Sequence, residues 1–436
     1  MKIVRRICCG MDVHKNTIVA TIAKTDQDNI TQYQQKTFSS QNYDLHNLKD
    51  WLKVNQCFEA AMESTGKYWI PVFNVLEDEI DVRIVHPKYT KAIKGKKTDK
   101  KDSKWIADLF KFDLVRFSFI PPKEIRQLRE LSRYRIKLVG MRSSERNRYQ
   151  NAMTVSNIGL ASVLSDPFGK SAKAIMKEVL SSDIIDPDKI ASLLLKSSRK
   201  KCEAVLKSLE DSHIESDQRL KMKVVEEHMA ELDKHIEDLE IEMAKRCLSY
   251  SVYIRGLMSI PGISMIAAMI IIAEIGADMS VFESDKQLSS WAGLSPANNE
   301  SANKKKSVRI SKAGIYLKPL MVQCALSAIK VKDSYYQKKY DPIKRRRGHK
   351  KAIIAVARMM LIACYHIIES GETFHPSDYE DISKPKPSSN RQLLIVNLCT
   401  CQKGYFPQKR QSSASISEHS LMALSPSPIV TCSSLT

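Results

Sequence analysis

The spacing of apolar residues changes once along this chain, and that change limits the possible folds more than any other feature. In the first 115 residues, short apolar runs alternate with stretches of helical spacing. From residue 124 onward, helical spacing dominates to about residue 368. We therefore expect a mixed sheet flanked by helices, followed by domains that are mostly helical. A length of 436 residues allows about three domains.

The N-terminal part contains four short apolar runs that are typical of strands, at residues 7–13, 17–23, 57–62 and 82–85. The three residues between the first two runs predict a tight turn and hence a hairpin. Helical spacing covers residues 45–52 and 68–76.

Residues 124–148 form a long, Arg-rich helical pattern, and a second long pattern follows it. Its apolar residues recur at alternating steps of three and four, at Met222, Val225, Met229, Leu232, Ile236, Leu239 and Met243. This is a heptad seam with Glu and Lys on its flanks. The pattern fits a coiled-coil hairpin or a dimer contact, and equally a helix that packs on its own domain.

We place the domain boundaries where these patterns change. An α/β domain spans residues 1–118, a helical coiled-coil linker spans 119–250, and a mostly α-helical domain spans 251–375. Residues 376–436 form a tail, which becomes Ser-rich with scattered Pro and has no sustained period. Such composition is typical of disorder.

Three features indicate a reducing cytoplasm. The apolar run near the N-terminus is short and interrupted by Arg5 and Arg6, unlike a secretory signal. The longest apolar stretch, residues 263–273, is too short to span a bilayer, so we expect no membrane. The ten cysteines lack the regular spacing of a disulfide framework.

The net charge of +20 is concentrated in two windows. Residues 88–104 hold eight Lys and two Asp, whereas residues 304–351 hold sixteen Lys or Arg and two Asp. The rest of the chain is neutral. Concentrated positive charge predicts a polyanionic partner, with nucleic acid first and an anionic membrane surface second. The alternative is a basic, solvated surface.

Four carboxylates stand where an oxygen-ligand metal site could form. Asp12 ends the first strand, Glu63 ends a later one, and Asp99 and Asp102 share one face at the start of a helical pattern. Such acids suit Mg²⁺, and two Mg²⁺ ions can support phosphodiester chemistry. Alternatively, the two helical acids only complement the helix dipole. Nearby lysines would meet the phosphate backbone: Lys96, Lys97, Lys100, Lys101 and Lys104.

The C-terminal domain offers further contacts with nucleic acid. Pro261 and Gly262 separate two helical patterns, which fits a phosphate-binding helix-hairpin-helix or a simple break between core helices. Ser301 lies in a polar loop and could act as a nucleophile, whereas capping is the default role for Ser311. The basic residues expected to bind phosphates here are Lys304, Lys305, Lys306, Arg309, Lys312, Arg345, Arg346, Arg347, His349 and Lys350, with the last five at the start of an apolar helix.

Several segments resemble a known family. The stretches GMDVHKNTIVATIA, MESTGKYW, VHPKYTKAIKGKKTDKKDSKWIADL and LRELSRYRIKLV resemble the N-terminal half of the DEDD insertion-sequence transposases, relatives of the Piv/MooV DNA invertases. This resemblance implies a RuvC-like, RNase H-like domain in which Asp12, Glu63, Asp99 and Asp102 bind the metal. The stretch from residue 289 onward is similar to the Transposase_20 region, and matched motif to motif the serine that attacks DNA is Ser301, with Ser311 as the alternative.

The resemblance implies a DNA transposase or recombinase that moves its own insertion element in the bacterial cytoplasm, associated with the nucleoid. It would cleave and rejoin DNA with a serine nucleophile and Mg²⁺, for which Mn²⁺ can substitute. The resemblance further implies dimers that pair into tetramers. In some members of the family, an element-encoded guide RNA chooses the target and donor DNA. Two rival functions are a RuvC-like structure-specific endonuclease that uses water alone, and a non-catalytic nucleic-acid-binding remnant.

Overall fold

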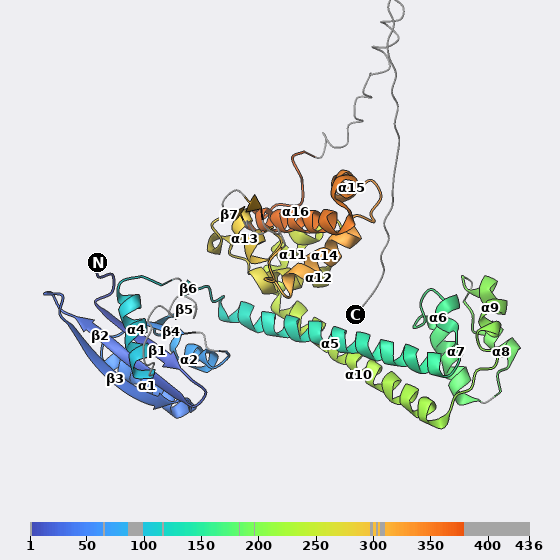
Figure 1. Ribbon diagram of the computed structural model, residues 1–436, viewed down its shortest axis with the longest axis horizontal. Helices are drawn as coiled ribbons and strands as arrows, with labels where there is room; N and C mark the ends of the chain where they lie inside the picture. The colour runs from blue at the N-terminus through green and yellow to red at the C-terminus, as the bar shows by residue number, and fades with distance from the viewer. Residues whose placement is uncertain are drawn as a thin grey trace, which may run out of the picture. The chain divides into compact units, whose positions relative to one another are not determined.

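The strands of the N-terminal part form one six-stranded mixed sheet (Figure 1). The computed structural model describes residues 2–63, 66–85, 99–115, 117–182, 184–195, 197–296, 300–301, 304–305 and 310–378. Residues 1–376 form one compact unit. Most of the expected tail, from residue 379 on, lies outside the described residues.

The sheet has the strand order β3-β2-β1-β4-β5-β6. Its strands are β1 (Ile7–Val13), β2 (Thr17–Thr25), β3 (Thr31–Ser39), β4 (Glu59–Glu63), β5 (Asp81–Val85) and β6 (Phe117–Ser118). The pairs β1–β4 and β4–β5 are parallel, and the other pairs are antiparallel. The mixed sheet expected from the sequence is therefore confirmed, with the predicted hairpin as β1 and β2. The sequence analysis missed β3, because its residues are mostly polar and exposed at the sheet edge.

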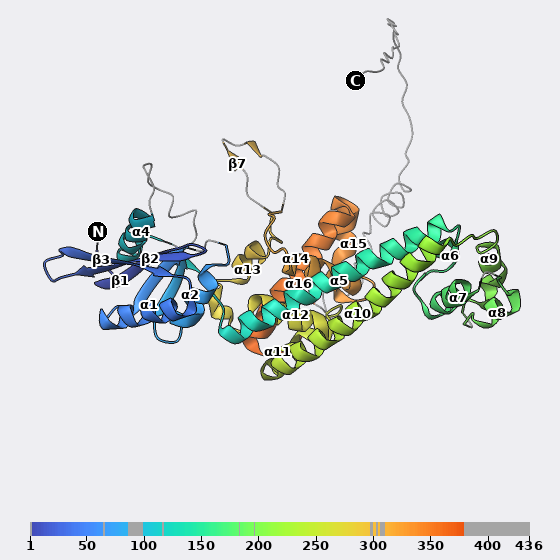
Figure 2. The same ribbon diagram turned by 90° about the horizontal axis from the view of Figure 1, so that it is seen from below.

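Helices cover both faces of this sheet (Figure 2). One face carries α1 (Asn42–Val54) and α2 (Trp69–Leu76), whose apolar side chains pack on Cys9, Met11 and Val13 of β1. The other face carries α4 (Asp99–Lys111). A Cβ atom on Gly10 would lie 2.2 Å from the backbone nitrogen of Ala107, so α4 rests directly on the backbone of β1.

Two long helices, α5 (Lys123–Val155) and α10 (Ser216–Arg246), lie side by side as an antiparallel hairpin (Figures 1 and 2). The heptad seam of α10 is covered within the same chain: Leu232 and Ile236 pack against Leu138 of α5. At these residues the seam is therefore covered by a helix of the same chain, and they do not offer a free dimer contact.

Opposite charges also join the two helices of the hairpin. α5 carries nine basic and three acidic residues, whereas α10 carries six Lys or Arg and nine acidic residues. Ion pairs join Arg135 to Glu240 and Arg142 to Asp233. Together the two helices carry 15 basic and 12 acidic residues, so they contribute only +3 to the net charge.

A small helical tip connects the two arms of the hairpin. It contains α6 (Leu160–Val163), α7 (Lys170–Ser181), α8 (Pro187–Ser192), the 3-10 turn η1 (Arg199–Lys201) and α9 (Cys202–Lys207). Their apolar residues form a core with Tyr149 of α5 and Met222 of α10. This separate core was not predicted from the sequence.

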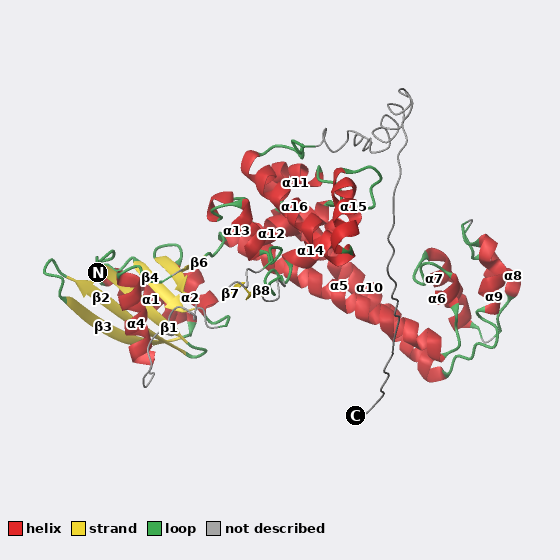
Figure 3. Cartoon of the chain, turned by 45° about the horizontal axis from the view of Figure 1, so that its top comes forward, coloured by secondary structure: helices red, strands yellow, loops and turns green. Residues whose placement is uncertain are grey.

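The C-terminal part is mostly helical, as expected (Figure 3). Its helices are α11 (Ser251–Met258), α12 (Met265–Ile275), α13 (Asp285–Trp291), α14 (Leu317–Ala328), α15 (Tyr335–Arg347) and α16 (His349–Ser370), with the 3-10 turns η2 (Leu248–Tyr250) and η3 (Met279–Val281). They share one apolar core. A short ribbon of β7 (Glu300–Ser301) and β8 (Lys304–Lys305) precedes α14.

Within the described ranges, α16 is long and apolar enough to cross a membrane by length and composition alone. This helix is longer than the apolar stretch of residues 263–273, but Arg358 interrupts its apolar run. Ten of its residues are buried, and they belong to the core that the C-terminal helices share. Its burial is thus that of a core helix.

Candidate active site and nucleic-acid interface

Asp12 and Glu63 lie at the carboxyl ends of adjacent parallel strands. The register pairs Met11 with Met62, so the residues that follow are level with each other. Both acids belong to the sheet face that α4 covers, because Gly10 and Ala61, two residues earlier, contact this helix. Asp12 is 7% exposed and Glu63 is half-buried.

The first turn of α4 points toward the same edge. The Cys8 thiol donates to the carbonyl of Ala107 at 3.7 Å, while the carbonyl of Ser103, one turn earlier in α4, lies over Gly10. The helix therefore runs antiparallel to β1, and its N-terminus lies toward the Asp12 end of the strand. Asp99 begins α4, but its side chain lies outside the described residues, whereas Asp102 is half-buried.

The donor set at this edge fits a hard divalent cation. It consists of carboxylates, which are the preferred ligands of Mg²⁺. Among the residues whose side chains the structure describes, no three His, Cys, Asp or Glu lie close enough together to hold a metal ion. Asp99 is outside that search. The described acids thus share an edge of the sheet without forming a finished ligand cluster.

Two further polar features near these acids escaped the sequence analysis. The Nε2 atom of His14 lies 3.3 Å from Oδ2 of Asp12. The i, i+2 spacing of these residues on an extended strand is the signal that could have predicted their contact. In addition, the Ser103 hydroxyl lies 2.8 Å from that of Thr21, and the Gln35 amide donates to both. This network fixes the start of α4 over the sheet.

Ser301 lies in the short ribbon before α14, where it pairs with Lys304. A bridge between Pro296 and Ile310 closes the base of the surrounding loop. The side chains of Ser301, Lys304 and Lys305 lie outside the described residues, as do Lys306 and Arg309.

Ser311 takes part in a local turn. Its hydroxyl accepts a hydrogen bond from the backbone N–H of Ala313 at 3.3 Å, and its carbonyl accepts one from Lys318 at 2.6 Å. Ser311 thus closes a turn in the loop and does not cap a helix, since α14 begins only at Leu317 with Tyr316 as its N-cap residue. The capping prediction for Ser311 is therefore wrong.

The turn at Pro261 and Gly262 favours the simple break between core helices. Gly262 has φ +91°, and a Cβ there would lie 2.5 Å from the carbonyl of Cys324 in α14. The turn is thus packed against another helix. The side chain of Ser264 caps α12 by accepting from the N–H of Ala267.

Comparison with known proteins identifies the family of this chain. Residues 9–157 match a family model described as a transposase of the DEDD IS110 type, and residues 254–341 match one described as transposase IS116/IS110/IS902 family. The chain belongs to the IS110 family of transposases.

Two relatives of this transposase are insertion-element proteins. The transposase for insertion sequence element IS1111A of Coxiella burnetii is 23% identical over 322 residues, which are 72% of this chain and 79% of that protein. The uncharacterized 42 kDa protein of insertion element IS900 from Mycobacterium paratuberculosis is 28% identical over 124 residues, which are 28% of this chain and 31% of that protein.

The first group of lysines in the transposase is only partly described. Lys101 and Lys104 are exposed on α4, and the Lys104 ammonium lies 4.0 Å from the ring centroid of Tyr33 on β3. The side chain of Lys100 is outside the described residues, as are Lys96 and Lys97.

The second basic group is divided between two helices. Arg345, Arg346 and Arg347 end α15, where they complement the helix dipole, and do not begin the apolar helix as the sequence analysis expected. Gly348, at φ +80°, separates them from His349 and Lys350 at the start of α16. These side chains and that of Lys312 are exposed.

His349 also has a partner inside the transposase. Its Nδ1 atom lies 2.6 Å from the hydroxyl of the buried Tyr340. This contact joins the two helices on either side of Gly348.

Proposed function

We propose that this transposase cleaves and rejoins DNA strands, with Mg²⁺ held by Asp12, Glu63, Asp99 and Asp102 and with Ser301 as the nucleophile. The observation that carries the proposal is the placement of three of these acids by two parallel strand ends and one helix start. An RNase H-like fold of the N-terminal domain belongs to the proposal. It is supported by the meander β3-β2-β1 that continues into the parallel strands β4 and β5.

Bound Mg²⁺ would supply positive charge to the scissile phosphate and its leaving oxygen. Ser301 would attack the phosphorus, lose its hydroxyl proton and form a phosphodiester, while the sugar oxygen leaves and takes up a proton. Because one P–O bond replaces another, the linkage retains the energy needed for rejoining. The reverse attack by a second DNA end would restore Ser301.

Basic side chains would hold the DNA. Lys101 and Lys104 extend from the helix that carries Asp102, and Arg345, Arg346 and Lys350 are exposed in the C-terminal part. Phosphate contacts of this kind orient a duplex without reading its sequence. A guide RNA would recognise the DNA sequence. We propose such an RNA on the basis of the family resemblance.

A homodimer or tetramer is also part of the proposal, since strand exchange needs more than one active site. The seam of α10 is covered by α5 at Leu232 and Ile236, so these residues do not offer the contact between copies. The proposed location is the bacterial cytoplasm, at the nucleoid.

Cleavage assays with purified protein, labelled element ends and Mg²⁺ test this function. Asp12→Asn should abolish cleavage while DNA binding persists, and His46→Asn, an exposed change on α1, should have no effect. Cleavage without covalent capture of DNA would favour the endonuclease. Binding without cleavage by the unmodified chain would favour the non-catalytic remnant.

A further inference from the structure

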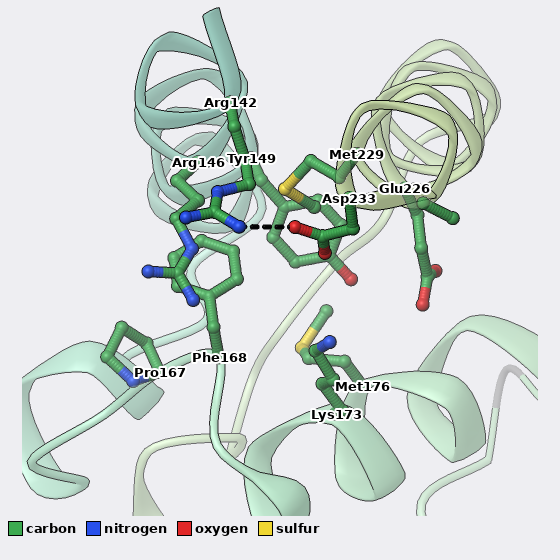
Figure 4. A pocket seen from close by; sticks show the side chains of 11 residues that line it. Arg142, Arg146, Tyr149, Pro167, Phe168, Lys173, Met176, Glu226, Met229 and Asp233 are labelled. Carbon is green, nitrogen blue, oxygen red and sulfur yellow. Dashed lines mark hydrogen bonds and ion pairs between the residues drawn. The ribbon is translucent and has the colours of Figure 1, made fainter. Parts of the chain in front are cut away.

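A hollow of about 160 Å³ lies where the helical tip meets the hairpin (Figure 4). It is formed by α5, α7, α10 and the loop that carries Phe168. None of the acids or serines assigned to the strand chemistry lines it. A water molecule occupies about 30 Å³ in the liquid, so the hollow accommodates one flat group of modest size and not a drug-sized ligand.

Helical spacing brings the lining side chains together. Arg142, Arg146 and Tyr149 share one face of α5, and Asp233 lies on the facing side of α10. Figure 4 shows Arg142 beside Asp233 between the two helices, with Phe168 next to Arg146 and Lys173 on the helix below. Glu226 lies on the far side of α10 from Arg146 and points away from Phe168.

The charges in this hollow are not all paired. Arg142 forms an ion pair with Asp233. In contrast, neither Arg146, Lys173 nor Glu226 has an ion-pair partner in the part of the chain that the structure describes. The two cations are therefore available for a ligand.

Arg146 lies over an aromatic ring. Its guanidinium lies 4.8 Å from the ring centroid of Phe168, which is half-buried and contacts Tyr149 with ring centroids 5.8 Å apart. A guanidinium stacked on an aromatic ring presents a second flat face, on which an unstacked nucleic-acid base can lie.

We propose that this hollow binds one unstacked base of a single nucleic-acid strand. The base stacks on the face of the Arg146 guanidinium that is turned away from Phe168, and Lys173 contacts the adjoining phosphate. The site is separate from strand cleavage, and it can be tested whether or not the chain cuts DNA.

Photo-crosslinking of the full-length protein tests the site. The probes are single-stranded 12-mers, one deoxyribose and one ribose, with a central 5-iodocytosine. The crosslinked peptide should contain Phe168 or Tyr149, and the more reactive probe identifies the strand as DNA or RNA. A crosslink confined to peptides outside the hollow would overturn the proposal.

Variants separate stacking from packing. Phe168→Leu keeps an apolar side chain but removes the flat ring, and it should lower the crosslink yield at this site at least about fivefold. Arg146→Gln should do the same, whereas Lys200→Gln, an equal charge change on η1, should not.

A protein ligand is the competing occupant. Unchanged crosslinking in Phe168→Leu, together with a changed oligomeric state on size-exclusion chromatography, would assign the hollow to a contact between copies and overturn the base site. Circular dichroism melting verifies that each variant is folded.

Discussion

Gly10 determines how closely α4 approaches the sheet. Its missing side chain leaves room for the backbone of Ala107 and Ser103, and this contact brings the start of α4 to the edge that holds Asp12. Gly10 has no functional side chain, but its close contact with α4 thus positions the candidate metal ligands.

Gly10→Ala should therefore destabilise the N-terminal domain by roughly 1–3 kcal/mol, since the new Cβ would collide with backbone atoms that have no rotamer to change. Urea unfolding measures the loss. The matched control is Gly140→Ala in the middle of α5, where no atom lies within 4 Å of the added Cβ. That change should stabilise by about 0.5–1 kcal/mol. Equal effects at both positions would contradict the close contact of α4.

Cysteine reactivity gives a second test at the residue scale. Burial raises the pKa of Cys8 and of Cys57 to about 12. At pH 8 such a thiol is ionised in roughly one molecule in ten thousand. Iodoacetamide should therefore label the half-buried Cys202 well before either of them, as read by peptide mass spectrometry. Labelling should become faster as the pH rises. Rapid labelling of Cys8 at pH 8 would show that the strand is not buried as described.

At the scale of secondary-structure elements, charged side chains of α5 join this helix to α12. Arg133 forms two hydrogen bonds, of 2.8 and 2.9 Å, with the buried carboxylate of Glu274. Its guanidinium also lies 4.6 Å from the ring centroid of Tyr316. Tyr316 follows the loop that carries Ser301 and directly precedes α14. Arg129 caps the end of α12 through the carbonyls of Ala273 and Glu274.

Arg133→Gln should destabilise the protein by roughly 1–3 kcal/mol, because it leaves the Glu274 carboxylate buried without its cation, although solvent reaches part of the arginine. Thermal melting measures the change. Arg246→Gln, which breaks an exposed pair with Glu242 on α10, should cost at most about 0.5 kcal/mol. If both variants melt alike, Glu274 does not depend on Arg133.

The sequence predicted elements well where one face was buried and the period was regular. Ile7–Val13 is recovered as β1 with the same bounds, because six of its seven residues are buried. β3 was missed because an edge strand needs only backbone pairing, which polar residues satisfy as well as apolar ones. Arg345 was assigned to the wrong helix, since only the positive φ of Gly348 reveals the break.

The candidate site was predictable in part for similar reasons. Asp12 and Glu63 were found because a carboxylate at the end of an apolar strand is conspicuous. The contact of His14 with Asp12, and the network of Gln35 with Ser103, depend on pairing between distant segments, and no local pattern encodes them.

For the molecule as a whole, the excess positive charge lies in the two windows near the proposed chemistry, because basic and acidic residues are equal in number in the rest of the chain. The C-terminal core is closed by Phe374, which stacks on Tyr336 with ring centroids 5.5 Å apart. No later residue in the described part of the chain belongs to a core cluster.

Removal of residues 379–436 should therefore leave the melting temperature within about 2 °C of the full chain, whereas Phe374→Ala should lower it by several degrees. Differential scanning fluorimetry compares the two. A large drop on truncation would mean that the tail stabilises the folded unit.

The central claim is that two separate parts of the chain, carboxylates in the N-terminal domain and Ser301 in the C-terminal one, act in one reaction. Mass spectrometry of protease-digested protein after reaction with element-end DNA and Mg²⁺ tests it most directly. We predict a nucleotide adduct on the peptide containing Ser301, present in Ser311→Ala and absent in both Ser301→Ala and Asp12→Asn. Strand exchange by Ser301→Ala, or an adduct on another residue, would contradict the account.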